Sequence, residues 1–297
     1  METLETLHKR ISSTEQLQSL VRNMKSLSAA SINQYEHAVT VLEDYQTAIE
    51  RGLQAVLMDD VPKPRPSHSA PAAIGLVVIG TDRGLCGRFN EYVTDRADQI
   101  ARRLLSQNRA VHFIAIGSRA EVRLREMGHH VDQTIFVPGS SHGLSTVVQS
   151  ALIRVDRWQE EHSVGRVEII ANTRGKNQRI QPMVQPLLPV AQDWLEALAE
   201  RRWPARGLPT FTVSPGMLFS WLIRQHLFIS LFRTLAESLA AEHASRLSAM
   251  QTAERNIKEH LEDAHAEFRH QRQNQITTEL MDLVAGFETL QGSDEDN

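Results

Sequence analysis

The chain has 297 residues, which is enough for about two domains. It carries 36 acidic and 32 basic residues, and a net charge of −4 excludes the strong positive field that nucleic-acid binding needs. A single cysteine excludes an internal disulfide. The most apolar run, residues 217–232, is too short and too polar in its middle to span a membrane.

Residues 1–60 are predicted to form one long helix. Apolar or small residues recur every three or four positions from Leu4 to Val56, with one step out of register near Leu17. That spacing is typical of a helix with one buried seam, and neither proline nor glycine occurs before Gly52. Three prolines between residues 62 and 66 then exclude a helix, so 61–72 is interpreted as a stiff linker.

Residues 73–210 are predicted to form an inserted Rossmann-like, mostly parallel α/β domain. Buried strands are expected at 73–80, 111–116, 131–137 and 167–171. Helices are expected between them at 89–107, 118–127 and 143–162. This alternation favours a doubly wound sheet with right-handed crossovers. The remainder of the domain is interpreted as a polar loop at 172–181, extended chain at 182–189 and a short helix at 194–201.

Residues 214–291 are predicted to form a second long helix. Ser214 and Pro215 are a typical helix start, and no later residue of the chain is proline. A helix of about 75 residues would be roughly 110 Å long, which no compact domain of this size can cover. The two terminal helices are therefore predicted to pair as an antiparallel two-helix coiled coil, from which the α/β domain is inserted.

The turn after the first strand lies where doubly wound folds hold phosphates. Its glycines, at 80, 84 and 87, match neither G-x-G-x-x-G nor the P-loop, because Asp82 and Arg88-Phe89 stand at the wrong places. Asp82 would also repel a phosphate. We therefore interpret the segment as a structural turn, formed by Asp82, Arg83, Gly84, Leu85, Cys86 and Gly87.

No other residues suggest catalysis. Cys86 has no base nearby in the sequence, so burial as a small apolar residue is favoured over a role as nucleophile. The thirteen histidines lack ligand spacing, and Ser141 and His142 are adjacent residues, which rarely face each other. We predict no catalytic residue, no cofactor and no metal site.

A polar cluster on the C-terminal helix invites a different interpretation. It consists of Arg269, Arg272, Gln273, Thr277 and Glu279. A solvated helix face would explain these residues, but an isolated polar helix of this length is not expected to hold together unaided.

Two motifs resemble the gamma subunit of F-type ATP synthases. Residues 77–90 resemble the family's S/T-D-R/K-G-L-C-G-x-x-N segment. Residues 242–250, then Asn256 and residues 272–280, are similar to its C-terminal signature, E-x-x-A-R-x-x-A-M…N…R-Q-x-x-I-T-x-E-L. The match at 17–24 is partial, because the family's basic T-Q-K-I-T-K-A-M run reads L-Q-S-L-V-R-N-M here. This departure suggests a divergent branch, such as an alternative bacterial F-type ATPase.

The resemblance implies a non-catalytic rotor shaft that couples ion flow through the membrane ring to ATP synthesis or hydrolysis at the beta-subunit sites. It implies three partners, namely the alpha3-beta3 hexamer of the head, the epsilon subunit and the membrane c-ring. It implies neither nucleic-acid binding nor direct membrane insertion. The mildly acidic isoelectric point and the lack of a transit-peptide pattern favour the cytoplasmic face of a bacterial inner membrane.

The resemblance also assigns roles by position. Contacts with beta would come from Arg272, Gln273, Thr277 and Glu279. The place where the shaft leaves the hexamer would be marked by Met24, Glu242 and Arg246. An apolar collar would surround the tip formed by Leu280, Leu283, Val284 and Phe287.

Two other functions remain open at this point. A Rossmann-type nucleotide-binding enzyme with helical arms would bind nucleotide specifically and turn it over. A coiled-coil scaffold protein unrelated to ATPases would self-associate through its terminal helices. A rotor would instead co-purify with three alpha and three beta subunits.

Overall fold

The computed structural model describes residues 3–58, 73–175, 177, 179–203, 207 and 210–294, with the side chains of 285–294 left out. The predicted linker at 61–72 lies outside these residues. The chain divides into two compact units, one of residues 28–246 and one that combines 1–27 with 247–297. Two long helices, α1 (Leu4–Leu57) and α6 (Pro215–Asp294), contribute to both units. The domain boundaries expected at residues 60, 72 and 210 stay predictions.

One five-stranded sheet lies in the unit of residues 28–246, with the strand order β3-β2-β1-β4-β5. Its strands are β1 (Ala73–Ile79), β2 (Ala110–Ile116), β3 (Gln133–Ile135), β4 (Val164–Arg174) and β5 (Ile180–Leu188). The first four are parallel, and β5 pairs antiparallel with β4. The predicted α/β class with a mostly parallel sheet is confirmed.

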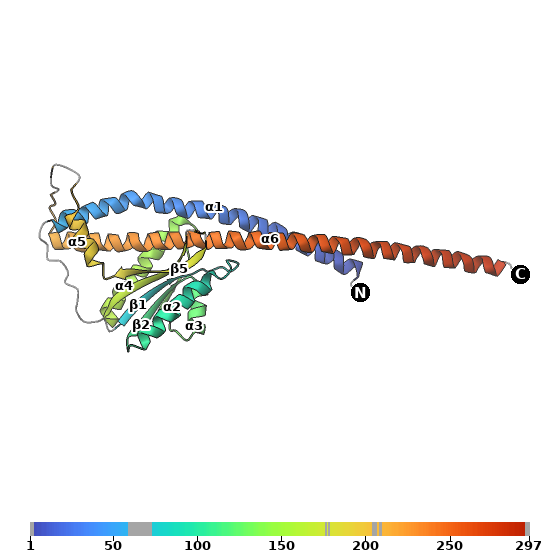
Figure 1. Ribbon diagram of the computed structural model, residues 1–297, viewed down its shortest axis with the longest axis horizontal. Helices are drawn as coiled ribbons and strands as arrows, with labels where there is room; N and C mark the ends of the chain where they lie inside the picture. The colour runs from blue at the N-terminus through green and yellow to red at the C-terminus, as the bar shows by residue number, and fades with distance from the viewer. Residues whose placement is uncertain are drawn as a thin grey trace. The chain divides into compact units, whose positions relative to one another are not determined.

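Helices cover both faces of this sheet (Figure 1). They are α2 (Phe89–Leu105), α3 (Ser118–Glu126) and α4 (Leu144–His162), and a 3-10 turn (Ser141–Gly143) precedes α4. A further helix, α5 (Gln192–Glu200), packs on α1 and α6 instead of on the sheet. One face packs against α2 and α3 through alternate β1 residues such as Leu76 and Val78. The other face packs against α4 and α6, with Tyr35 of α1 in the same core. Parts of the long helices therefore belong to the core of the α/β domain.

The prediction of a loop at 172–181 was wrong at both of its ends. β4 continues to Arg174, and β5 begins at Ile180. Residues in these extensions pair across the strands, as Asn172 does with Pro182 and Thr173 with Gln181. The polar sequence misled the prediction because antiparallel backbone pairing does not require apolar side chains, especially at an edge strand.

The two long helices pair antiparallel, as predicted, and each unit shows this on its own residues. In the unit of 28–246, Tyr35 stacks on His243 at 5.7 Å between ring centroids, and Tyr45 donates a hydrogen bond to Gln225 (2.9 Å). In the other unit, Ile11 packs with Leu261, and Lys25 pairs with Glu254 at 2.6 Å. Higher residue numbers on α1 meet lower ones on α6 in both units.

Nearly all of the predicted seam is buried or half-buried. Its buried members include Leu7, Ile11, Val21, Tyr35, Ile49, Leu53, Val56, Leu222, Ile229, Phe232, Leu239, Met250 and Leu261. Two residues placed in the seam were predicted wrongly, because Leu17 (53%) and Tyr45 (41%) are exposed. Leu17 stands where the spacing steps out of register, so the helix turns its side chain away from the seam. No helix in the described part of the chain is long and apolar enough to cross a membrane.

Candidate functional site

Residues 81–87 form a tight turn at the carboxyl end of β1. Leu85 and Gly87 both have left-handed backbone conformations, with φ of 62° and 60°. Asn90 closes the turn, because its side-chain amide donates to Thr81 Oγ1 (2.8 Å) and its Oδ1 accepts from the Thr81 N–H (3.0 Å). The turn is thus held by hydrogen bonds of its own, which supports the structural role predicted for it.

Asp82 ties this turn to the start of α3 and to the loop after β3. Its Oδ1 accepts a hydrogen bond from the Ser118 N–H and its Oδ2 accepts one from the Val137 N–H, both at 2.7 Å. The Ser118 N–H belongs to the first turn of α3, where a carboxylate is favoured by the helix dipole. Asp82 therefore uses backbone donors of the kind that a phosphate would need in a nucleotide-binding fold.

The outer side of the turn docks on α6. Ser245 Oγ donates to the Cys86 carbonyl (2.7 Å), and Arg246 Nη2 donates to the Gly84 carbonyl (3.4 Å). Cys86 and Phe89 pack against Ala241 of α6. The crevice at the carboxyl end of a doubly wound sheet is where such folds bind ligands, and here a helix of the same chain covers it.

A buried ion pair anchors this contact. Glu242 and Arg246 are each only 5% exposed, and Arg246 Nη2 lies 2.5 Å from Glu242 Oε1. Burial raises the pKa of Glu242, although the charge and the hydrogen bond of Arg246 oppose the rise. The pair therefore combines a desolvation cost with a strong charge-assisted hydrogen bond.

Two neighbouring groups are kept neutral around this pair. Burial, followed by the charges of Arg246 and Arg83, lowers the pKa of His243 to about 4, so its ring is uncharged at neutral pH. Its Nδ1 lies 3.4 Å from Arg246 Nη1 and can accept a hydrogen bond from it. Burial also raises the pKa of the Cys86 thiol, with Glu242 adding to the rise. A catalytic cysteine needs the opposite shift.

The structure brings some of the predicted residues together. The turn of residues 82–87, Glu242 and Arg246 form one contact within the unit of 28–246. Sequence reasoning missed the two side chains that complete it, Ser245 and Asn90. Asn90 is the last residue of the matched motif at 77–90, and an asparagine beside a tight turn commonly hydrogen-bonds to nearby backbone, so the sequence did carry a signal for it. Nothing in the local sequence marks Ser245.

The remaining predicted residues lie in the other unit. Met24 is half-buried on α1, and Arg272, Gln273, Thr277 and Glu279 are exposed on α6. Glu279 accepts a hydrogen bond from Gln275 (2.9 Å). Every described side chain from Arg269 to Val284 is exposed, except for a half-buried Gln271. Five of these are large and apolar, namely Ile276, Leu280, Met281, Leu283 and Val284.

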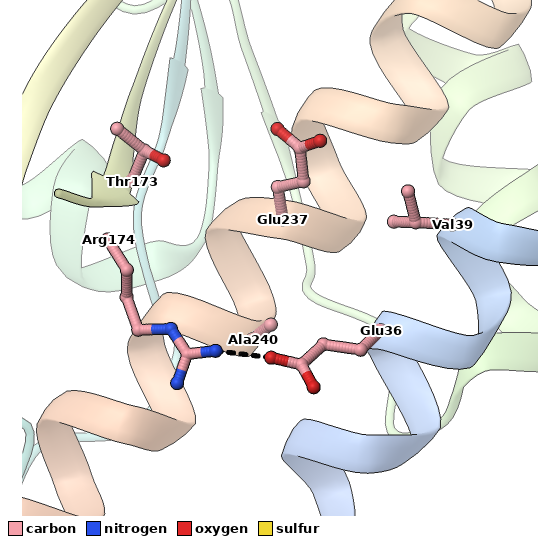
Figure 2. Close-up of a pocket in the computed structure, with 6 residues that line it drawn as sticks. All are labelled: Glu36, Val39, Thr173, Arg174, Glu237 and Ala240. Carbon is pink, nitrogen blue, oxygen red and sulfur yellow. Dashed lines mark hydrogen bonds and ion pairs between the residues drawn. The ribbon is translucent and has the colours of Figure 1, made fainter. Parts of the chain in front are cut away.

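A hollow of about 240 Å³ lies between α1, α6 and the end of β4. Arg174 reaches past Ala240 to form an ion pair with Glu36, and Glu237 lies nearby (Figure 2). This ion pair links the end of β4 to α1. No group of three or more His, Cys, Asp or Glu side chains in the described ranges is arranged to hold a metal ion.

The covered crevice and the exposed apolar helix together define a class of protein. A helix of the chain itself packs on the turn where an α/β enzyme would bind its ligand, and the same helix exposes apolar side chains between Ile276 and Val284. The fold is that of an α/β domain inserted between two long paired helices.

Comparison with known proteins identifies the family. A family model described as ATP synthase matches residues 3–290, so the chain belongs to this family. It is 27% identical to the ATP synthase gamma chain of Pelotomaculum thermopropionicum and 28% identical to that of Brucella ovis. Each alignment covers 98% of this chain and 100% of the relative.

Solved structures share the fold. A chain in the Euglena gracilis mitochondrial ATP synthase OSCP/F1/c-ring structure has a TM-score of 0.63 and 17% identity, covering 98% of this chain and 95% of that one. A chain in the Tetrahymena thermophila mitochondrial ATP synthase central stalk and c-ring structure has a TM-score of 0.57 and 19% identity, covering 79% and 99%.

The chain is therefore a gamma subunit, the rotor of the central stalk of an F-type ATP synthase. It has no catalytic role of its own. The predicted family, function and non-catalytic role are confirmed, and they exclude both the Rossmann-type enzyme and the unrelated scaffold.

Proposed function

We propose that residues 269–284 of α6 turn inside the alpha3-beta3 hexamer of the head. The observation that carries this proposal is the exposure of nearly every side chain in the segment, including Leu280 (58%) and Leu283 (61%). An unsupported helix is only marginally stable in water. Enclosure by partner subunits would remove these apolar side chains from water.

The polar side chains of this segment would provide the contacts with beta. Arg272, Gln273, Thr277 and Glu279 present charges and hydrogen-bonding groups among the apolar residues. A helix that rotates inside the head cannot pack tightly against it, because a closely packed interface would cost several kcal/mol to break at each step. A few polar contacts suffice for coupling, because about 1.4 kcal/mol of differential contact changes the affinity of a site tenfold. An apolar collar would surround the tip at Leu280, Leu283 and Val284, whereas the side chain of Phe287 lies outside the described residues.

The place where the shaft leaves the hexamer would involve Met24 in one unit and the docked turn in the other. Glu242 and Arg246 are nearly buried, so they would act mainly by holding the turn against α6. The turn itself presents Leu85, which is 62% exposed, and Arg83, which is also exposed. These residues would meet the lever region of beta.

The α/β domain would face the epsilon subunit and the c-ring, on the cytoplasmic face of a bacterial inner membrane. Two observations support this assignment. The similar structures are a central stalk with its c-ring and an F1 head with its c-ring, and the similar gamma chains of Pelotomaculum and Brucella are bacterial.

Arg272→Ala combined with Glu279→Ala is expected to reduce assembly or coupling about fivefold while leaving the fold of the chain intact. Both side chains are exposed, and within the described residues Glu279 bonds only to Gln275, so their loss removes little from the chain itself. The variant would be co-expressed with alpha and beta subunits and the rest of the complex. Recovery of three alpha and three beta subunits measures assembly, ATP-driven ion pumping measures coupling, and thermal melting of the free chain measures the fold.

A matched control removes one arginine and one glutamate from the α/β domain, so that the net charge is unchanged in both double variants. Arg125 and Glu121 pair at 2.5 Å on α3, and Arg125→Ala with Glu121→Ala should assemble and pump as the unmodified chain does. Unchanged assembly and pumping in the Arg272 and Glu279 double variant would show that these contacts do not matter.

A further inference from the structure

A basic cavity lies at the amino end of the parallel strands, away from the turn of residues 81–87. It has a volume of about 230 Å³ and lies between the end of α2 and the start of β4. Its charged lining consists of Arg103, Arg109, Arg166 and Glu168. The site described above uses none of these residues.

The end of α2 places two of the arginines. Asn108 has a left-handed backbone, with φ of 58°, and reverses the chain so that Arg109 follows closely on Arg103. The Leu104 carbonyl accepts hydrogen bonds from the N–H groups of Gln107 (3.0 Å) and Arg109 (3.1 Å). This carbonyl is therefore satisfied within the chain, which weakens the repulsion that a helix C-terminus would exert on an anion.

Two irregularities in strand pairing, one in β4 and one in β5 opposite it, lie beside the third arginine. Ala73 of β1 pairs with Val164, but Ile74 pairs with Arg166, so β4 contains one extra residue at this point. The pairing of β4 with β5 shifts again between Val167 and Glu168. Bulges of this kind re-aim side chains, and they lie where Arg166 and Glu168 enter the lining.

The charges in this cavity do not balance. Glu168 is only 7% exposed, and its Oε1 accepts from Arg166 Nε (2.8 Å) and Nη2 (2.5 Å). The guanidinium groups of Arg103 and Arg109 make no hydrogen bond or ion pair with any described residue. The lining thus holds three guanidinium groups and one carboxylate, and a bound anion would offset the uncompensated positive charge.

We propose that this cavity binds an anionic phosphate group. Guanidinium groups match the oxygens of phosphate in bidentate geometry, and several around one cavity strengthen the attraction. The volume suits a phosphate or diphosphate group and is below the usual range for a drug-sized ligand. The group would belong to a free phosphate compound or to the headgroup of an anionic phospholipid.

Titration of the full chain distinguishes these sources. In the first arm, inorganic pyrophosphate is titrated into the chain and calorimetry measures the binding, at about 50 mM salt, where screening is moderate. The second arm uses flotation with phosphatidylglycerol vesicles, compared with phosphatidylcholine vesicles. Saturable binding of pyrophosphate at one site assigns the cavity to free phosphates. Binding of phosphatidylglycerol vesicles alone assigns it to a lipid headgroup.

Variants show whether this cavity is responsible. Arg103→Gln with Arg109→Gln should weaken binding about tenfold or more, and thermal melting should show an intact fold, because neither guanidinium makes a hydrogen bond or ion pair with a described residue. Glu168→Gln should tighten binding severalfold, because it frees Arg166 and removes the competing carboxylate. The control, Arg102→Gln with Arg125→Gln, makes the same charge change outside the cavity and should leave the affinity within about twofold.

The proposal fails if neither pyrophosphate nor phosphatidylglycerol vesicles bind. It fails equally if the control variant weakens binding as much as the Arg103 and Arg109 variant does. The Arg103 and Arg109 comparison decides the matter even if Glu168→Gln does not fold.

Discussion

Replacing Arg246 with methionine is expected to lower the free energy of unfolding by about 3 kcal/mol at pH 8. Methionine keeps much of the volume of the side chain but leaves the Glu242 carboxylate buried without its partner. Glu242 is only 5% exposed, so water cannot replace the lost 2.5 Å contact without opening the turn. Urea unfolding of the full chain, followed by circular dichroism, measures the change.

The loss should be smaller at pH 5. Burial raises the pKa of Glu242 above 4.5, and removing the opposing charge and hydrogen bond of Arg246 raises it further. The folded variant then holds a proton that the unfolded chain has lost, so its stability falls as the pH rises from about 4.5 through the raised pKa. The pKa of His243, about 4 with Arg246 present, also rises when that charge is removed, and this too favours the variant at acid pH.

Adding Glu242→Gln to the Arg246→Met variant should recover most of the lost stability, because a neutral amide needs no countercharge. As a control, Arg125→Met breaks the 2.5 Å pair of Arg125 with Glu121. The Arg125 side chain is 59% exposed, so the free energy of unfolding should fall by less than about 1 kcal/mol. Equal losses for the two arginine variants, or no recovery with Glu242→Gln, would show that the buried pair does not stabilise this contact.

Gly75→Ala is expected to destabilise the chain by about 2 to 3 kcal/mol. A Cβ at Gly75 would lie 2.5 Å from Cζ3 and 2.7 Å from Cε3 of Trp158. Trp158 is fully buried, and its Nε1 donates to Asp132 Oδ2 at 2.8 Å, so the ring has little freedom to move away. The clash should outweigh the 0.5 to 1 kcal/mol or so that replacing glycine in a strand would otherwise contribute.

Gly139→Ala is the matched control, because an added Cβ there meets nothing within 4 Å. Its stability should stay within about 0.5 kcal/mol of the unmodified chain. Thermal melting of both variants tests the account, and equal melting temperatures for the two would contradict the close packing of Gly75 on Trp158.

The elements that sequence patterns predicted well are those whose information is local. β1 is a continuous apolar run and is buried on both faces, and most seam residues of α1 and α6 follow a helical period. The loop predicted at 172–181 failed because the pairing of β4 with β5 is carried by the backbone. The predicted burial of Leu17 was wrong because one step in the period decides which side of the helix is covered.

The contacts of the candidate site were out of reach for a different reason. Asp82 accepts hydrogen bonds from Ser118 and Val137, and Arg246 donates to Gly84, which is 162 positions earlier in the chain. Local patterns cannot show such pairings. The sequence did show that Asp82 disfavours phosphate in this turn. The structure adds that Asp82 uses the nearby N–H groups itself.

Enclosure of the exposed end of α6 by the head is tested most directly by labelling a cysteine placed there. Leu280→Cys would be reacted with a maleimide in the free chain and in the complex with alpha and beta subunits, while buried Cys86 stays unreactive. Leu280 is 58% exposed, so labelling should be fast in the free chain and at least about tenfold slower in the complex. Val122→Cys on α3, where the side chain is 48% exposed, should react alike in both. Equal labelling of Leu280→Cys in the free chain and the complex would contradict a shaft that turns inside the head.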